Sequence, residues 1–284
     1  MSVELSDNAY GKSQVRLTKV TRLADRHELK EIAVDIQLRG GFEDCYFKGD
    51  NTAVLPTDTM KNTVYALATQ HPLDSIESFA LFMSDHFLNH PQVKHATSVT
   101  ITMRESRWNR VETAGKAHPW AFVSAGNEKR VCKVHRTREG ASVQGGIEDL
   151  LVLKTADSGF VDFIRDQYTT LPDTPDRIFA TSIKSTWLYA DAEQDWNAGY
   201  DAVRNAIIQT FAAHKSLAVQ QTLYAMGETA LAACAGVNEI EFWLPNQHRI
   251  PINLAPLGLK NANEIFVTTS EPFGLISGTI RRKG

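Results

Sequence analysis

The stretch LPTDTMKNTVYALATQHPLDSIESFALFMSDHFLNHPQVKHATSVTITM at residues 55–103 decides the fold, because it predicts two helices followed by a strand. The first helix starts after Pro56, since the side chains of Thr57 and Asp58 can accept hydrogen bonds from first-turn N–H groups. Its apolar face follows helical spacing and consists of Met60, Val64, Leu67 and Ala68.

A second helix and a strand complete this stretch. Asp74 with Glu77 resembles a capping box, and apolar side chains recur at positions 76, 79, 80, 83 and 87. Residues 98–103 then alternate, with Val99, Ile101 and Met103 on one face, which is typical of a half-buried antiparallel strand.

The same order recurs in the second half of the chain. Helical spacing predicts helices over residues 196–211 and 219–230, and residues 239–244 alternate as a strand. Strand-like segments precede the helix pairs, at 15–20 and 33–38 in the first half and at 178–189 in the second. The pattern therefore occurs twice at a period of roughly 140 residues, a common domain size, with a join near residues 154–157. Exposed turns are expected around residues 126–129 and 137–146.

Helix pairs set between antiparallel strands predict an α+β fold, in which helices cover one side of each sheet. The open edges of such sheets need protection, and pairing edge to edge between subunits supplies it. We therefore expect an obligate oligomer.

Composition narrows the classes of partner. The 284 residues include 30 basic and 33 acidic side chains, a net charge of −3, so nothing indicates nucleic acid or an anionic membrane as a partner. No apolar run approaches the ~20 residues of a membrane span. The N-terminus lacks the cationic and apolar regions of a signal peptide, and the chain ends Arg281-Arg282-Lys283-Gly284 rather than with a peroxisomal signal. With three scattered cysteines, a cytoplasmic protein without disulfides is expected.

Common cofactor and metal motifs are missing from the sequence. It contains no GxGxxG, no GxxxxGK[ST] and no GxSxG. His86 and His90 lie four residues apart with His95 nearby, but the end of a helix favours cationic side chains without any metal. No HExxH accompanies them, so we expect no metal site.

Five segments are informative as a set. They are Tyr10-Gly11-Lys12, TDTMKNT at 57–63, RDQYTTL at 165–171 with Asp176-Arg177, Val219-Gln220, and LPNQH at 244–248. In order and spacing they resemble the urate oxidase (uricase) family, from Tyr10 to about Leu275. Thr59 and Gln247 differ from the family pattern at positions next to functional residues. The peroxisomal C-terminal signal is missing, and in this the sequence resembles bacterial, cytosolic members of the family.

This resemblance implies an oxidoreductase without a cofactor. Members convert urate, dioxygen as co-substrate, and water to 5-hydroxyisourate and hydrogen peroxide in purine degradation. The implied fold is the tunnelling fold, or T-fold, with tandem domains at residues 1–153 and 154–284. The implied assembly is a homotetramer of barrels with active sites at subunit interfaces.

The resemblance also assigns binding residues. Alone, Arg177 would be read as a surface ion pair, Phe160 as a core side chain and Gln220 as a polar residue in a first helical turn. In the family pattern the Arg177 fork grips one edge of the planar urate anion, Gln220 grips the opposite edge, and Phe160 stacks on the ring. The backbone at Val219 also meets the purine, while the amide of Asn246 holds dioxygen.

Three further residues carry the expected catalysis. Alone, Lys12 would be a solvated charge and Thr57 a helix cap. In the family pattern Lys12 and Thr57 relay a proton through water, His248 orients or protonates part of that relay, and the Asp58 N–H contacts urate. On an alternating strand, positions 246 and 248 face the same way, so both side chains can reach one cavity. Lys12, Thr57 and Asp58 are implied to come from one subunit, and the remaining site residues from its neighbour.

Two other functions remain open from the residues. An enzyme of the same fold acting on pterins or another purine would need a metal or a cluster of carboxylates and cysteine. A urate or purine binder would need Arg177 and Gln220 but not Lys12 and His248.

Overall fold

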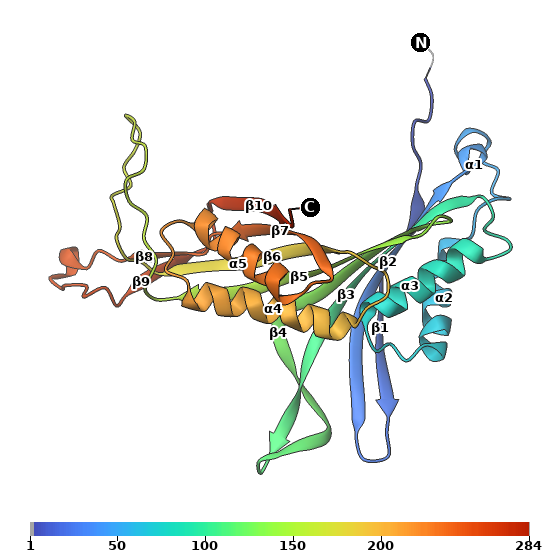
Figure 1. Ribbon diagram of the computed structural model, residues 1–284, viewed down its shortest axis with the longest axis horizontal. Helices are drawn as coiled ribbons and strands as arrows, with labels where there is room; N and C mark the ends of the chain where they lie inside the picture. The colour runs from blue at the N-terminus through green and yellow to red at the C-terminus, as the bar shows by residue number, and fades with distance from the viewer. Residues whose placement is uncertain (1–2, 284) are drawn as a thin grey trace. The chain divides into compact units, whose positions relative to one another are not determined.

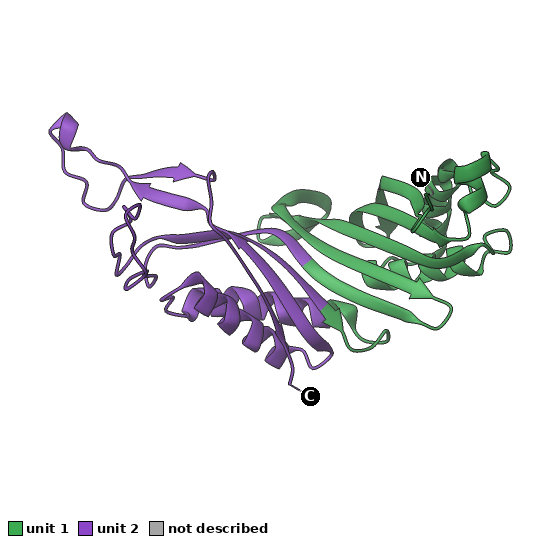
Figure 2. Cartoon of the chain, turned by 90° about the horizontal axis from the view of Figure 1, so that it is seen from above, with its two compact units in different colours: residues 1–146, 188–197 green, residues 147–187, 198–284 purple. Residues whose placement is uncertain are grey.

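The computed structural model describes residues 3–283 as an α+β protein with antiparallel sheet strands (Figure 1). The chain forms two compact units (Figure 2). The first unit contains Met1–Gly146 and Leu188–Asn197, and the second contains Ile147–Trp187 and Ala198–Gly284. Among the described residues, no helix is both long and apolar enough to cross a lipid bilayer.

The first unit follows the predicted order of elements. Its strands are β1 (Tyr10–Arg22), β2 (His27–Gly40), β3 (Ala96–Thr113) and β4 (Lys116–Thr137), hydrogen-bonded as antiparallel neighbours in that order. Between β2 and β3 come α1 (Glu43–Lys48), α2 (Thr57–Gln70) and α3 (Ile76–Asn89). β5 (Ala141–Lys154) begins in this unit and continues into the second.

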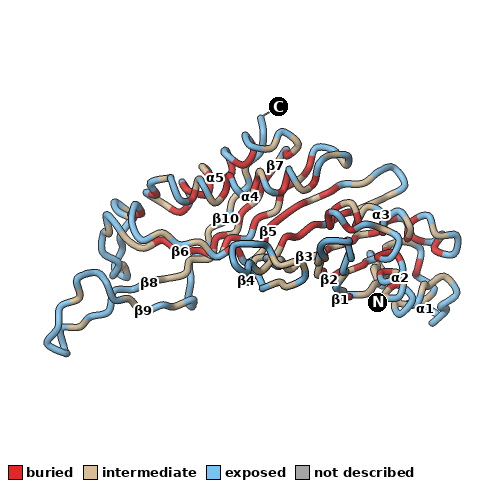
Figure 3. Tube along the Cα trace, turned by 90° about the horizontal axis from the view of Figure 1, so that it is seen from below, coloured by how far each residue is buried: buried red, intermediate tan, exposed pale blue. Residues whose placement is uncertain are grey.

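Helices α2 and α3 cover one face of this sheet, as predicted. α2 packs on β1 and α3 packs on β3 and β4. The alternation along β2 buries one set of side chains to 2% exposure or less, namely Ile32, Val34, Ile36 and Leu38. All four predicted apolar positions of α2 are buried as well, so hydrophobic burial orients the helix on the sheet (Figure 3).

The second unit repeats this arrangement. It contains β6 (Phe179–Tyr189, whose last two residues belong to the first unit), α4 (Trp196–Ala213, whose first two residues belong to the first unit), α5 (Val219–Ala233), β7 (Val237–Pro245) and β10 (Leu275–Arg281). The strand order is β5-β6-β7-β10, and α5 packs on β7 and β10. Between β7 and β10, the hairpin of β8 (His248–Pro251) and β9 (Phe266–Thr269) encloses the short helix η1 (Ala255–Leu257). The predicted double repeat of strands and helices is therefore confirmed.

Two predicted helix caps are wrong. α2 starts at Thr57, but its N-cap residue is Pro56 and no side chain caps the first turn. The Asp58 carboxylate instead accepts hydrogen bonds from the side chains of Lys61 and Asn62. At α3 the cap is Ser75, whose Oγ accepts the Ser78 N–H at 3.1 Å, rather than Asp74 in a box with Glu77.

The predicted turn at residues 126–129 is also wrong, because β4 continues through it. Ser106 pairs with Lys129 and Trp108 with Ser124, so the intervening residues form a bulge in the strand. Near residues 137–146, only positions 138–140 form the connection, because β5 begins at Ala141.

Candidate active site

The second unit contains a cavity of about 360 Å³ beside the start of β6 and the start of β8. Its walls come from three parts of this unit: residues 171–180, residues 246–251, and two side chains of the β8–β9 region. Three of the predicted site residues line it: Arg177, Asn246 and His248. The cavity therefore joins residues that are about 70 positions apart in the sequence.

Arg177 lies two residues before β6 and is anchored by its backbone. Its N–H donates to the Ser158 carbonyl at 2.7 Å. Its guanidinium carbon lies 5.4 Å from the centre of the Phe160 ring, within the range of a cation–π contact. Burial lowers the pKa of the Arg177 guanidinium. Among residues 3–283 it has no ion-pair partner, so the surface salt bridge suggested by its type alone is wrong.

A cation that is half buried without a counter-ion is costly, and an anion in the cavity would offset that cost. Its neighbour Asp176 does not fill this role, because the Asp176 Oδ1 atom accepts the Ser158 N–H at 3.2 Å. The Arg177 guanidinium is therefore available to a negatively charged ligand.

Asn246 provides a second unsatisfied group in the same cavity. Its backbone N–H donates to the Gly274 carbonyl at 2.9 Å, which fixes the chain, but its side-chain Oδ1 is buried and has no partner among the described residues. Buried polar atoms nearly always have a hydrogen-bond partner, and exceptions call for an explanation. A ligand or water that donates to Oδ1 would satisfy it.

His248 lines the cavity by a different route from the predicted one. β7 ends at Pro245 and β8 begins at His248, so positions 246 and 248 do not lie on one alternating strand. The turn between the strands is held by the Gln247 N–H, which donates to the Ala180 carbonyl at 2.9 Å. Both side chains nevertheless line the same cavity.

Phe160 sits beside Arg177 rather than in the core. It is half buried, and its backbone exchanges two hydrogen bonds with Thr174. Its ring stacks on Phe163 with centroids 4.8 Å apart and planes at 8°. A flat ligand would therefore use the ring face of Phe160 that Phe163 leaves uncovered.

Val219 and Gln220 open helix α5, which is tied to the Phe160 segment through Ser216. The Gly159 N–H donates to the Ser216 carbonyl at 2.8 Å. Val219 is buried and Gln220 is exposed, and neither is among the residues that line the cavity. No side chain caps α5, so its first backbone N–H groups are available to an acceptor.

Lys12, Thr57 and Asp58 lie together in the first unit. The Leu55 N–H donates to the Tyr10 hydroxyl at 2.9 Å, which ties the start of β1 to the segment that leads into α2. Glycine is required at position 11, because a Cβ there would lie 1.8 Å from the Ile36 carbonyl oxygen. Asp58 has a lowered pKa, mainly through its hydrogen bond and charge interaction with Lys61 and to a smaller extent through the charge of Lys12. Lys12 therefore lies near the first turn of α2.

The histidines near the end of α3 do not form a metal centre with other described residues. Within residues 3–283, no group of three or more His, Cys, Asp or Glu side chains is placed to hold a metal ion. The rings of His86 and His90 lie 5.7 Å apart at the end of α3, without a third ligand.

Comparison with known proteins identifies the family. The family model described as Uricase matches residues 8–135 and 143–277. This chain belongs to the uricase family. It is 40% identical over 282 residues to the uricase of Arthrobacter globiformis, covering 99% of this chain and 91% of that protein. The uricase of Oryctolagus cuniculus is 37% identical over 288 residues, covering 99% and 95%.

Solved uricase structures support the assignment of the chain to the uricase family. The crystal structure of the Arthrobacter globiformis uricase superposes with a TM-score of 0.94 at 39% identity, covering 100% of this chain and 96% of that one. A mutant urate oxidase from Bacillus sp. TB-90 has a TM-score of 0.83 at 22% identity, over 97% of this chain and 99% of that one, which supports the fold alone. As a member of the uricase family the chain is an oxidoreductase.

Reasoning from the sequence missed some residues of the site. Ser158 and Ser216 are both buried and join two loop segments through a parallel bridge. The Arg177 N–H, which donates to the Ser158 carbonyl, joins a third segment to them. Gly159 has little room, since a Cβ there would lie 2.8 Å from the Pro175 carbonyl oxygen. The dipeptide Ser158-Gly159 just before Phe160 is the sequence signal that could have marked this junction.

Proposed function

We propose that this chain is a urate oxidase that needs no cofactor. Urate, dioxygen and water become 5-hydroxyisourate and hydrogen peroxide: urate loses two electrons, dioxygen gains them, and the oxygen of water is added to the purine. The electron-rich urate dianion itself reduces dioxygen, so the protein's task is deprotonation, alignment and exclusion of bulk water. The observation that carries the proposal is the unpaired, half-buried guanidinium of Arg177 at the cavity in the second unit.

In this proposal Arg177 grips urate from one edge. Its planar fork matches adjacent acceptors on a flat anion, which a lysine does not. Gln220 grips the opposite edge through its amide, with the Val219 N–H at the uncapped start of α5 as a further donor. The exposed Gln220 side chain has to turn toward the ligand for this role. Phe160 stacks on the purine ring beside the guanidinium.

The proposed chemistry divides between two groups of residues. Lys12 removes a proton from bound urate, and the Thr57 hydroxyl passes it to an ordered water. Asp58 contributes its backbone N–H from the uncapped first turn of α2. Dioxygen, and later peroxide or water, rests on the amide of Asn246, whose Oδ1 lacks a partner among residues 3–283. His248 orients or protonates this relay.

We propose further that the chain works as a homotetramer of T-fold barrels with sites shared between subunits. Two observations support sharing. Lys12, Thr57 and Asp58 belong to the first unit and the remaining residues to the second. Large apolar side chains in the segment that precedes the cavity-lining Leu171 are exposed in the single chain, with Ile164 at 96% and Tyr168 at 80%. A neighbouring subunit that covered them would stabilise the assembly by the hydrophobic effect.

Oxygen uptake by chelator-treated protein tests the function. Addition of urate should consume one dioxygen and release one peroxide per urate, and Arg177→Ala should abolish this. Arg281→Ala is the matched control, since Arg281 is an exposed arginine of the same unit that pairs with Glu239. Urate binding without release of peroxide would indicate a non-catalytic protein that binds urate. Activity that returns only with an added metal would indicate a metalloenzyme of the same fold.

A further inference from the structure

Strand β1 contains one residue more than its partner at a critical point. Lys12 pairs with Ile36 and Val15 pairs with Val34, so two residues of β1 oppose the single residue Asp35 of β2. This is a β-bulge. Its second residue, Gln14, has φ of +56°, in the left-handed region that few residues other than glycine adopt.

The bulge decides which side of the sheet Lys12 faces. Directly opposed residues share a face, and Ile36 and Val34 are both buried beneath the helices. Lys12 and Val15 therefore both face the layer that contains α2. Regular alternation counted from Val15 would turn Lys12 to the opposite face, away from Thr57.

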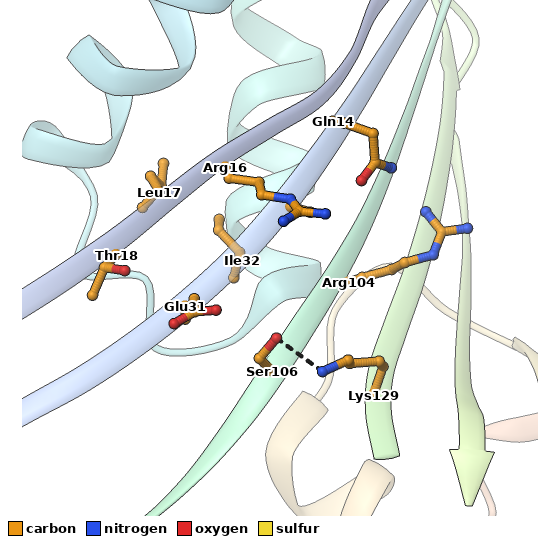
Figure 4. A pocket seen from close by; sticks show the side chains of 10 residues that line it. Gln14, Arg16, Leu17, Thr18, Glu31, Ile32, Arg104, Ser106 and Lys129 are labelled. Carbon is orange, nitrogen blue, oxygen red and sulfur yellow. Dashed lines mark hydrogen bonds between the residues drawn. The ribbon is translucent and has the colours of Figure 1, made fainter. Parts of the chain in front are cut away.

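Asp35 holds this bulge in place. Its side chain lies on the face opposite to Ile36, where Oδ1 accepts the Gln14 backbone N–H at 2.7 Å and Oδ2 accepts from Arg104 Nη1 at 3.0 Å. Figure 4 shows Gln14 on β1 and Arg104 on β3 at the hollow on this part of the sheet. A carboxylate is a strong acceptor for an N–H that the bulge removes from the strand ladder.

We propose that Asp35 is a positioning residue for the reaction: by bonding the Gln14 N–H it keeps the extra residue of β1 out of the ladder and so keeps Lys12 on the side of α2. This inference rests on the proposed role of Lys12 as the base. Asp35 lies outside all five segments that carry the family resemblance.

Substitutions at position 35 test it through a split between kcat and KM. Asp35→Ala should lower kcat about 100-fold or more, because a base turned to the opposite face no longer contributes the ~10²–10⁴-fold of a positioned general base. KM for urate should stay unchanged, because Arg177 and Gln220 lie in the second unit and the Asp58 N–H lies on α2, outside the strand that changes. Asp35→Asn keeps an oxygen acceptor and should retain most of kcat. Gln37→Ala is the matched control, on the same strand and face. Asp35→Val, in a residue that favours strands, replaces Asp35→Ala if the latter does not fold.

Deletion of Gln14 provides a second test of the proposal. Without the extra residue, regular pairing still sets Lys12 opposite Ile36, so the deletion variant should remain active and Asp35→Ala should have no effect in that background. An equal loss of kcat in both backgrounds, or a folded but inactive deletion variant, would overturn the proposal.

Hydrogen–deuterium exchange separates this inference from the proposed function. The peptide containing Gln14 should exchange at a different rate in Asp35→Ala than in the wild type or Gln37→Ala, whatever the substrate, because the Gln14 N–H loses its acceptor and the strand pairing around it changes. Unchanged exchange contradicts the role of Asp35. A wild-type protein that does not oxidise urate contradicts the proposed function instead.

Discussion

Two inactive variants should regain urate oxidation when their subunits mix, if active sites are shared between subunits. Lys12 belongs to the first unit and Arg177 to the second, so Lys12→Ala and Arg177→Ala damage different halves of the proposed site. Each variant alone should have almost no activity. Co-expressed with different affinity tags and purified through both tags, they should form mixed tetramers with measurable oxidation of urate.

The size of the recovery follows from the division of the halves. A site is intact only when its first half comes from the Arg177→Ala chain and its second half from the Lys12→Ala chain. With equal amounts and random assembly, each condition holds for half of the sites, so about one quarter of the sites should be intact. Oxygen uptake should therefore approach about a quarter of the wild-type rate per subunit before the double-tag selection.

A pair of variants in the same half is the control. Arg177→Ala mixed with Asn246→Ala should give no recovery, because both residues line one cavity and no mixed site regains both. Native mass spectrometry confirms that subunits have mixed. Mixed tetramers of Lys12→Ala and Arg177→Ala that stay inactive would refute the shared site.

Three further variants test the site and the core. Arg177→Lys should lower kcat/KM about 10- to 100-fold in oxygen uptake, since a lysine loses the fork while keeping the charge. Asn246→Ala should lower kcat while leaving the melting temperature unchanged or higher, because it removes a buried oxygen that has no partner in the part of the chain that the structure describes. Arg130→Met should lower the free energy of urea unfolding by about 3–5 kcal/mol at pH 8, since it leaves the fully buried Glu77 carboxylate without its partner at 2.7 Å. Burial raises the pKa of Glu77 above its unfolded value. The loss should thus be smaller near pH 5 and grow as the pH rises through the folded pKa.

The repeated element order could be predicted from the sequence because burial alone imposes it. The apolar stripe of α2 and the alternation of β2 each have one buried face, and both patterns are local. The caps could not be predicted equally well. Glu77 has the right spacing for a capping box, yet it bonds Arg130, which is 53 residues away. A distant ion pair outweighs a local hydrogen bond once the helix is buried.

For the site too, the sequence predicts which residues take part but not the surroundings of their side chains. The motifs point to Arg177, Asn246 and His248, and the structure brings these three into one cavity. Residue type alone suggests an ion pair for Arg177, because spacing along the chain does not reveal which carboxylates a fold brings near. Gln220 illustrates the converse, since its position in a first helical turn does not specify where an exposed side chain points.

The orientation of Lys12 shows most clearly what a sequence motif does not predict. Tyr10-Gly11-Lys12 is followed by Ser13 and Gln14, and nothing in these letters states that one of the next residues is extra to the ladder. Because side chains alternate with a period of two, that single residue decides whether the amine faces α2 or the opposite side of the sheet. The bulge is bonded by a carboxylate on another strand, 21 residues along the chain. A protein could therefore keep every residue of the motif and still lose the proposed base, if position 35 no longer supplied an acceptor and the extra residue entered the ladder.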